Sequence, residues 1–147
     1  MKLYFAHNFN NRIKFRKIEL QLEKKLNIEL YNPFYDDLNR KKEMFKFDNN
    51  KKQRFHINQK NANFIVQRDL TALAACDGLL TIVDLPSFGT TIEICNATLM
   101  KKPIYFISQK YINHAWIKVY ATYRFRNIKE FKKFIIKERK NEKKKNN

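Results

Sequence analysis

Short apolar runs that alternate with helix-like segments constrain the fold of this chain more than any other feature. The clearest run is Leu79 to Val83, and similar runs occupy residues 2–6, 28–31 and 104–107. Strands that are this short and continuously apolar are typical of a parallel sheet buried on both faces. The pattern therefore predicts an α/β protein with a mostly parallel sheet that helices cover on both sides.

Apolar residues recur at helical spacing in four other segments of the chain. These predicted helices span residues 12–26, 65–73, 90–100 and 128–140. The stretch from Asp36 to Asn63 is polar and weakly patterned, so we expect short helices and mobile loops there. At 147 residues the chain suits one ordinary domain. We predict a single domain over residues 1–138, followed by a disordered basic tail over residues 139–147.

The chain is strongly basic, with 31 lysines and arginines against 14 acidic residues and a formal net charge of +17. Such a charge can indicate binding to nucleic acid or to a membrane surface. Here, however, lysine, asparagine and isoleucine are abundant throughout and only two residues are glycine, a pattern typical of compositional drift. We interpret the charge mainly as solvated surface, with attraction of anionic ligands as the alternative, and do not expect nucleic acid as a partner.

The sequence predicts a cytoplasmic protein that does not enter a membrane. No apolar run approaches the roughly 20 residues that span a bilayer, and the N-terminus lacks the apolar stretch and cleavage site of a signal peptide. Cys76 and Cys95 lie in apolar, helix-like contexts, which predicts buried free thiols. His7, His56 and His114 have no metal-binding spacing, and we expect them at the surface.

The stretch from Pro86 to Glu93 is the most informative for chemistry, because it follows a buried strand and opens a helix. The hydroxyls of Ser87 and Thr90 are suited to cap that helix, and Gly89 would allow a tight turn with close approach of a ligand. Glu93 would then lie in the first turn, where the helix dipole favours the ionised form that a carboxylate nucleophile needs. The alternative is a capping box, in which the glutamate only satisfies the helix N-terminus.

Other polar residues are predicted to accompany Glu93. Tyr4 lies towards the end of the first apolar run, Asp69 on the helix before the central strand, Asp77 at the end of that connection, and Asp84 directly after the strand. Each has an ordinary structural role available, as a core aromatic, a surface residue, a turn or a cap. Several carboxylates at one sheet edge nevertheless suit a reaction in which one is the nucleophile and another handles protons.

Ligands of such sheets bind outside the carboxyl ends of the strands. We therefore expect the loops at residues 7–11, 31–37 and 84–89 to bind substrate, with Phe9 and Asp84 among the contacting residues. The aromatic residues of the C-terminal third are predicted to lie in the core or at a subunit interface. They are Trp116, Tyr120, Tyr123 and Phe125.

Three separated segments share their order and spacing with a known enzyme family. They are Leu3-Tyr4-Phe5-Ala6 followed by Phe9, Arg68-Asp69-Leu70 with Asp77 eight residues later, and Gly89-Thr90-Thr91-Ile92-Glu93-Ile94 continuing to Lys102-Pro103-Ile104. Together they resemble the nucleoside 2-deoxyribosyltransferase family. The resemblance covers the chain from Lys2 to about Ile107 and is weak over residues 36–64. It implies a single-domain flavodoxin-like or Rossmann-like three-layer α/β sandwich that is usually a homo-oligomer.

The resemblance also implies a role for each matching residue. Glu93 matches the family nucleophile, which forms a covalent deoxyribosyl intermediate as the base departs. Tyr4 matches the tyrosine that holds this nucleophile, and Asp69 matches the acidic residue that transfers protons near the leaving base. The implied partners are deoxynucleosides and free nucleobases, with retention of configuration and no metal or organic cofactor. Purine exchange in nucleoside salvage is our hypothesis for the biological role.

Two residues give conflicting indications about the reaction. Ser87 stands six residues before the nucleophile, where the transferases commonly carry an aspartate, and a serine there resembles the related 5′-monophosphate N-glycosidases. A hydroxyl can donate to a phosphate, which a carboxylate would repel. Asn113, aligned with a gap, instead matches an asparagine of the transferases that reaches a neighbouring subunit's 5′-hydroxyl. We favour deoxyribosyl transfer, with deoxynucleoside 5′-monophosphate hydrolysis as the alternative and a non-catalytic nucleotide- or nucleic-acid-binding protein as the second.

Overall fold

The computed structural model describes residues 1–36 and 59–145 of the chain. One five-stranded sheet forms its centre, in the order β2-β1-β3-β4-β5, and all neighbouring strands are parallel. The strands are β1 (Lys2–Ala6), β2 (Glu29–Tyr31), β3 (Gly78–Ile82), β4 (Ile104–Ile107) and β5 (Tyr123–Phe125). The predicted parallel sheet is thus confirmed. Its order is the flavodoxin-like one, in which the chain reverses direction across the sheet between β1 and β3 and leaves a crevice there.

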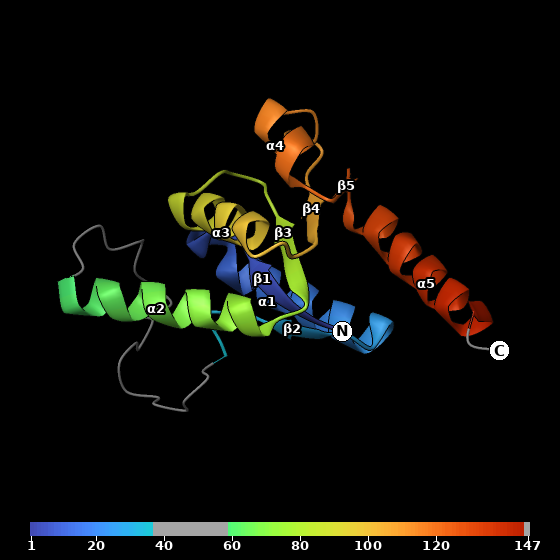
Figure 1. Cartoon of the computed structure of the whole chain (residues 1–147), viewed down its shortest axis with the longest axis horizontal. Coiled ribbons are helices and arrows are strands. Elements are labelled where there is room, and N and C mark those ends of the chain that lie inside the picture. The colour runs from blue at the N-terminus through green and yellow to red at the C-terminus, as the bar shows by residue number, and fades with distance from the viewer. Residues whose placement is uncertain (37–58, 146–147) are drawn as a thin grey trace.

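Helices form a layer on each face of the sheet (Figure 1). One face packs against α1 (Arg12–Leu26) and α5 (Ile128–Lys145). The other packs against α2 (Gln59–Ala75), α3 (Phe88–Leu99) and α4 (Ala115–Tyr120). A short 3₁₀ helix, η1 (Phe9–Asn11), connects β1 to α1. The structure therefore has the predicted three-layer sandwich.

The alternation of side chains along β1 divides its residues between the two layers. Leu3 and Phe5 lie in the core beneath α1 and α5, whereas Tyr4 and Ala6 lie in the core beneath α2 and α3. This follows from the two-residue period of a strand. All four side chains are 0% exposed. Tyr4 is therefore directed towards the helices that carry the two acidic residues predicted to act in catalysis.

Several element boundaries differ from those predicted. The strand at residues 104–107 is as expected, but α2 begins at Gln59, six residues early, and α4 and β5 were not predicted. Residues 59–63, expected to be loop or short helix, belong to α2, and the rest of that prediction, over residues 37–58, lies outside the described residues. No helix among the described residues is long and apolar enough to cross a membrane.

The prediction of a disordered tail from residue 139 is wrong for residues 139–145, because α5 continues through Lys145. Lysine, glutamate and arginine are good helix formers, and the C-terminal lysines lie where the helix dipole favours positive charge. The helix is also anchored. Phe131 and Ile135 are buried, and Arg139 Nη2 donates to the carbonyl of Asn27 at 2.8 Å, beyond the end of α1.

Candidate active site

The candidate site is built around a hydrogen bond between β1 and α3. The hydroxyl of Tyr4 donates to Oε1 of Glu93 at 2.6 Å. Tyr4 lies in the middle of β1 and is 0% exposed, whereas Glu93 keeps part of its surface exposed. A rigid strand therefore orients one oxygen of the Glu93 carboxylate. The structure brings together two residues that the resemblance paired.

Glu93 is not in the first turn of its helix, which corrects the expectation from sequence. The helix α3 begins at Phe88, two residues earlier than predicted, with Ser87 as its N-cap. Glu93 therefore stands six residues after the cap, in the second turn. The alternative of a capping box is excluded for it as well, because that role needs a residue three positions after the cap. Thr90 occupies that position, and its N–H is bound by Ser87 Oγ at 3.4 Å.

The protonation of Glu93 also differs from the expectation that the helix dipole would keep it ionised. Burial raises its pKa to about 7, and the negative charge of Asp69 acts in the same direction. The hydrogen bond from Tyr4 and the charge of Arg68 act against this and favour the ionised carboxylate. The result is a carboxyl group poised to change protonation near neutral pH, as is common at catalytic sites.

Asp69 lies on α2 close enough to Glu93 to influence its charge. Arg68, its neighbour, donates from Nε to Asp69 Oδ1 at 2.8 Å, and its Nη2 lies 2.7 Å from the same oxygen. Burial is the main cause that raises the pKa of the Tyr4 phenol, and the charges of Glu93 and Asp69 raise it further, which places Asp69 near that hydroxyl. Burial raises the pKa of Asp69 itself, while Arg68 opposes that shift. A carboxyl group of this kind is suited to hold and deliver a proton.

Ser87 and Gly89 lie at the start of α3. Ser87 is a cap, as predicted, and its hydroxyl donates to Thr90 Oγ1 at 2.9 Å. Gly89 does not make the tight turn that was predicted, because it is inside the helix and does not have a positive φ. A Cβ atom placed on it would meet no atom within 4 Å. Gly89 thus leaves open surface at the start of α3.

The acidic residues predicted at one sheet edge are only partly brought together. Asp84 follows β3 at the carboxyl edge but is exposed and paired with Lys14 of α1 at 2.6 Å. Asp77 lies at the opposite, amino edge, where its Oδ2 accepts the Lys2 N–H at 2.7 Å. Asp77 therefore has a turn role. The carboxylates next to Tyr4 are Asp69 and Glu93, which come from helices rather than from strand ends.

Phe9 lies in the connection that follows β1, and Asn113 lies in the connection that follows β4. Phe9 is half-buried in η1, with the Arg12 guanidinium carbon 4.0 Å above its ring. Asn113 is exposed in the turn before α4. Of the C-terminal aromatics, Phe125 is in the core as predicted, whereas Trp116 is 64% exposed. Both cysteines are free, Cys76 buried and Cys95 half-buried.

Three polar residues near the carboxyl edge are buried, which was not predicted from the sequence. His7, expected at the surface, is 3% exposed at the end of β1, and burial lowers its pKa to about 4. Glu19 of α1 and Asn32, which follows β2, are both 0% exposed and bonded to each other. A signal for Glu19 existed, since it falls on the helical stripe of the buried Phe15 and Leu22.

The arrangement combines groups that nucleophilic and acid–base chemistry need. Glu93 offers a carboxylate with one oxygen held by a hydrogen-bond donor, and Asp69 offers a second carboxyl group beside it. The pair lies near the β1–β3 switch point, where sheets of this order bind ligands. Among residues 1–36 and 59–145, no group of three or more His, Cys, Asp or Glu side chains could hold a metal ion.

The fold defines the chain as a flavodoxin-like α/β sandwich, and solved structures show which proteins share it. The 2-deoxyribosyltransferase of Bacillus psychrosaccharolyticus matches with a TM-score of 0.69 and 18% identity over 90% of each chain. A conserved protein of Enterococcus faecalis V583 matches with a TM-score of 0.59 and 16% identity, over 94% of this chain and 98% of that one. The CMP N-glycosidase of Clostridium botulinum matches with a TM-score of 0.56 and 17% identity, over 92% and 98%.

No family model matches the chain, and no curated protein is similar to it in sequence. At 16–18% identity these structural matches show a shared fold. They agree with the family that the three sequence segments resemble. Two of the matched structures are enzymes by name, a 2-deoxyribosyltransferase and a CMP N-glycosidase.

Proposed function

We propose that the chain is a nucleoside 2′-deoxyribosyltransferase, which exchanges the base of 2′-deoxynucleosides through a covalent intermediate on Glu93. The observation that carries the proposal is the 2.6 Å hydrogen bond from Tyr4 to Glu93, with Asp69 beside it near the β1–β3 switch point. The likeness in fold to a 2-deoxyribosyltransferase supports it. The ligands would be deoxynucleosides and free nucleobases, handled by a cytoplasmic homo-oligomer in nucleoside salvage.

The reaction would proceed in two displacements. Tyr4 engages Oε1 of Glu93, so Oε2 is the oxygen that attacks C1′ of the sugar. The C1′–N bond breaks, its electron pair goes to the base, and Asp69 delivers a proton to that base. A nitrogen of the incoming base then attacks C1′, the bond to Glu93 breaks, and Asp69 recovers a proton. Two displacements retain configuration, and a sugar that lacks the 2′-hydroxyl forms the cation-like transition state more easily.

Ser87 favours a second candidate, a deoxynucleoside 5′-monophosphate N-glycosidase. Its hydroxyl stands at the N-terminus of α3, where a helix dipole and a neutral donor both suit a phosphate. The similarity in fold to a CMP N-glycosidase points the same way. In this reaction water would replace the incoming base in the second displacement. A non-catalytic role in nucleotide or nucleic-acid binding, based on the net charge of +17, is the third candidate.

Product analysis by chromatography tests these candidates. Purified protein would be incubated with deoxyadenosine and free hypoxanthine, and separately with deoxynucleoside 5′-monophosphates. Glu93→Ala serves as the inactive variant, and Glu142→Ala, on the exposed end of α5, as the matched control. The transferase is established if the wild type and Glu142→Ala make a new deoxynucleoside and Glu93→Ala does not. Free base released from the monophosphates alone establishes the hydrolase, and no product from either mixture refutes both enzymatic candidates.

A further inference from the structure

The two helical layers of the sandwich differ in charge. The helices α1 and α5 carry 15 lysines and arginines against five acidic residues, whereas α2, α3 and α4, of similar total length, carry three against two. Compositional drift alone would place lysine on both layers alike. The positive charge of the described helices is therefore concentrated on one layer, and Asp69 and Glu93 belong to the other.

Five exposed lysines lie along one side of α5. We call them the lysine row: Lys129, Lys133, Lys137, Lys140 and Lys144. Their spacings of four, four, three and four residues place them within an arc of about 80° on a helix, over about 22 Å of its length. Phe131 and Ile135, which belong to the core, lie on the opposite side of the helix. The row is therefore directed away from the sheet.

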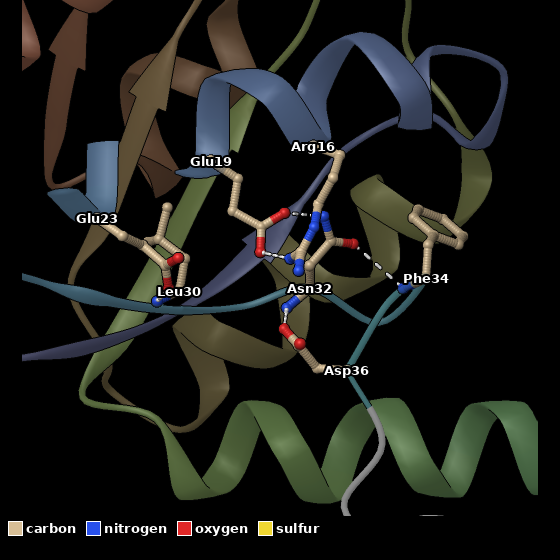
Figure 2. Close-up of polar contacts among 7 residues, drawn as sticks. All are labelled: Arg16, Glu19, Glu23, Leu30, Asn32, Phe34 and Asp36. Carbon is tan, nitrogen blue, oxygen red and sulfur yellow. Dashed lines mark hydrogen bonds and ion pairs between the residues drawn. The ribbon is translucent and has the colours of Figure 1, made fainter. Parts of the chain in front are cut away.

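The acidic residues of α1 are bonded inside the fold and do not compensate this charge. Figure 2 shows Glu19 and Glu23 directed from α1 towards β2 and the turn after it. Glu19 Oε2 accepts from Asn32 Nδ2 at 2.6 Å, and its Oε1 forms an ion pair with Arg16. Glu23 Oε1 accepts the N–H of Leu30 at 2.9 Å. The lysines in the last turn of α1, in contrast, are exposed to solvent.

The acidic residues of α5 are likewise turned away from the lysine row. Oε2 of Glu130 accepts a backbone N–H at the start of the helix at 2.8 Å. Glu138 and Glu142 follow Phe131 and Ile135 by seven residues each, which puts them on the side of the helix that faces the sheet. Among the described residues, no ion pair involves a lysine of the row. The row is thus a line of positive charges without acidic partners.

The end of α1 extends this basic surface. Arg139 Nη2 donates to the carbonyl of Asn27, just past α1, so the end of α1 lies against the C-terminal half of α5 (Figure 1). Lys24 and Lys25, both exposed in the last turn of α1, therefore lie at the same end of the layer as Lys140. We call the lysine row together with Lys24 and Lys25 the basic face.

The phosphate backbone of a nucleic-acid duplex is the ligand that suits the basic face. Lysines that neutralise successive phosphates release the counterions condensed on the duplex, which favours binding. Single strands are bound largely by stacking on aromatic side chains, and α1 and α5, which the structure describes in full, have no exposed aromatic residue. A lipid surface needs a continuous apolar face. The apolar face of α5 packs on the sheet, and Ile136 is the one exposed large apolar residue of this fully described helix.

We propose that the basic face binds the phosphate backbone of a double-stranded nucleic acid. Contacts of this kind carry no base sequence information, so the binding would be independent of sequence. The basic face and the candidate active site belong to opposite layers of the sandwich. The proposal therefore does not depend on the reaction proposed for Glu93.

Two triple variants separate the basic face from the overall charge. The row variant combines Lys133→Gln, Lys137→Gln and Lys140→Gln. The control variant combines Lys60→Gln, Lys110→Gln and Lys118→Gln, at exposed lysines outside α1 and α5. Each variant removes the same number of positive charges. Glutamine is about as good a helix former as lysine, so both variants should keep the unfolding free energy of the wild type.

Fluorescence anisotropy would measure the association constant for a short duplex of random sequence over a salt series. We expect this constant to fall steeply with salt for the wild type. The slope of its logarithm against the logarithm of salt concentration should become shallower by about three in the row variant, about one for each lysine lost. The control variant should keep the wild-type slope. Duplexes of DNA and of RNA show which backbone fits better, and binding of either supports the proposal.

Several results would overturn the proposal. Equal losses of affinity in the row and control variants would mean that overall charge alone attracts the duplex. Tighter binding to the single strand, to poly-glutamate or to vesicles of phosphatidylserine and phosphatidylcholine would assign the basic face to another partner. If circular dichroism shows that the row variant loses helix, Lys133→Gln and Lys140→Gln are tested singly, each with an expected change in slope of about one.

The outcomes also separate this proposal from the proposed function. Glu93→Ala should bind the duplex as the wild type does, and the row variant should keep any glycosidic activity of the wild type. If the wild type cleaves no N-glycosidic bond but binds a duplex through the lysine row, the proposed reaction is wrong and the basic face stands. If the wild type is active and binds no duplex, the role of the basic face is overturned and the reaction stands.

Discussion

Tyr4 and Glu93 are 89 positions apart in the chain, and the hydroxyl of one donates to the carboxylate of the other at 2.6 Å. Tyr4 is fully buried in β1, so its ring has no room to turn away. The bond is therefore a fixed property of the fold rather than a surface contact. It keeps a partly buried carboxylate in one orientation and favours its charged form, which is what a nucleophile requires.

Replacing Tyr4 with phenylalanine removes this hydrogen bond and leaves the packing nearly unchanged. The bond favours the charged carboxylate, so its loss raises the pKa of Glu93 further above its usual range. A hydrogen bond to a charged group contributes about 1.5–3 kcal/mol, so we expect kcat/KM at pH 7 to fall by roughly tenfold to a hundredfold. Steady-state kinetics over a pH series measures this. An unchanged profile in Tyr4→Phe would show that the tyrosine does not act on Glu93.

The pH profile of the wild type should rise as Glu93 loses its proton. Burial places its pKa at about 7, so the rate of glycosidic cleavage should increase as pH rises through 7. Asp69 contributes to that raised pKa through its like charge. Asp69→Asn should therefore move the rising limb to lower pH while slowing departure of the base, measured by single-turnover kinetics. Glu142→Gln provides the control for loss of a distant acidic group. If the rising limb of the pH profile stays at the wild-type pH in Asp69→Asn, the charge of Asp69 does not raise the pKa of Glu93.

The sheet could be predicted from sequence because its signals are local. Leu79 to Val83 and residues 104–107 are continuously apolar, and such runs form strands wherever helices can cover them. By contrast, β5 (Tyr123–Phe125) has two exposed residues out of three, so its hydropathy resembles that of a loop. It forms because β4 offers an open edge, which is a tertiary effect that a local pattern does not contain.

From the sequence, the site could be predicted only for residues whose spacing resembles that of the nucleoside 2-deoxyribosyltransferase family. Tyr4, Asp69 and Glu93 were named from such spacing, and the structure brings them together. The protonation of Glu93 was predicted in the wrong direction, because sequence shows the helix that carries it but not how deeply its carboxylate is buried. Glu19 was overlooked because the buried side chains of this helix were expected to be apolar, yet the apolar Ile13 and Leu20 are about half exposed and Glu19 is buried.

Glu19 should make the stability of the fold depend on pH. Burial raises its folded-state pKa from 4.5 to about 7, so the folded protein holds a proton that the unfolded chain has released. Stability should therefore fall as pH rises from about 4.5 to 7, by up to about 3 kcal/mol from this group. Urea unfolding at pH 5 and pH 8 should show a smaller difference in Glu19→Gln than in the wild type. Glu29→Gln, in a solvent-exposed ion pair with Lys2, should keep the wild-type difference.

Replacement of Gly78 or Gly89 with alanine should change the free energy of unfolding in opposite directions. A Cβ atom on Gly78 would lie 2.7 Å from the carbonyl oxygen of Pro103, a backbone atom that a strand pairing holds in place. Gly78→Ala should lower the free energy of unfolding by about 1–3 kcal/mol, the usual range for overpacking. Gly89 lies inside α3 with open space around it, so Gly89→Ala should raise the free energy of unfolding by up to about 1 kcal/mol. If Gly89 also allows close approach of the substrate, as expected from the sequence, Gly89→Ala would combine higher stability in denaturant unfolding with a raised KM.

Ser87→Asp distinguishes transfer between bases from cleavage of nucleotides. Aspartate caps a helix about as well as serine does, so α3 and the unfolding free energy should change little. Its charge, however, would repel a 5′-phosphate while accepting a hydrogen bond from a 5′-hydroxyl. For a deoxyribosyltransferase we expect exchange between deoxyadenosine and hypoxanthine to stay within a few-fold of the wild type or to improve. Ser87→Ala, which loses about 1 kcal/mol of capping, measures the effect of the cap alone. If the wild type instead releases base from deoxynucleoside monophosphates and Ser87→Asp abolishes that release, the serine is a phosphate ligand and the hydrolase is the correct assignment.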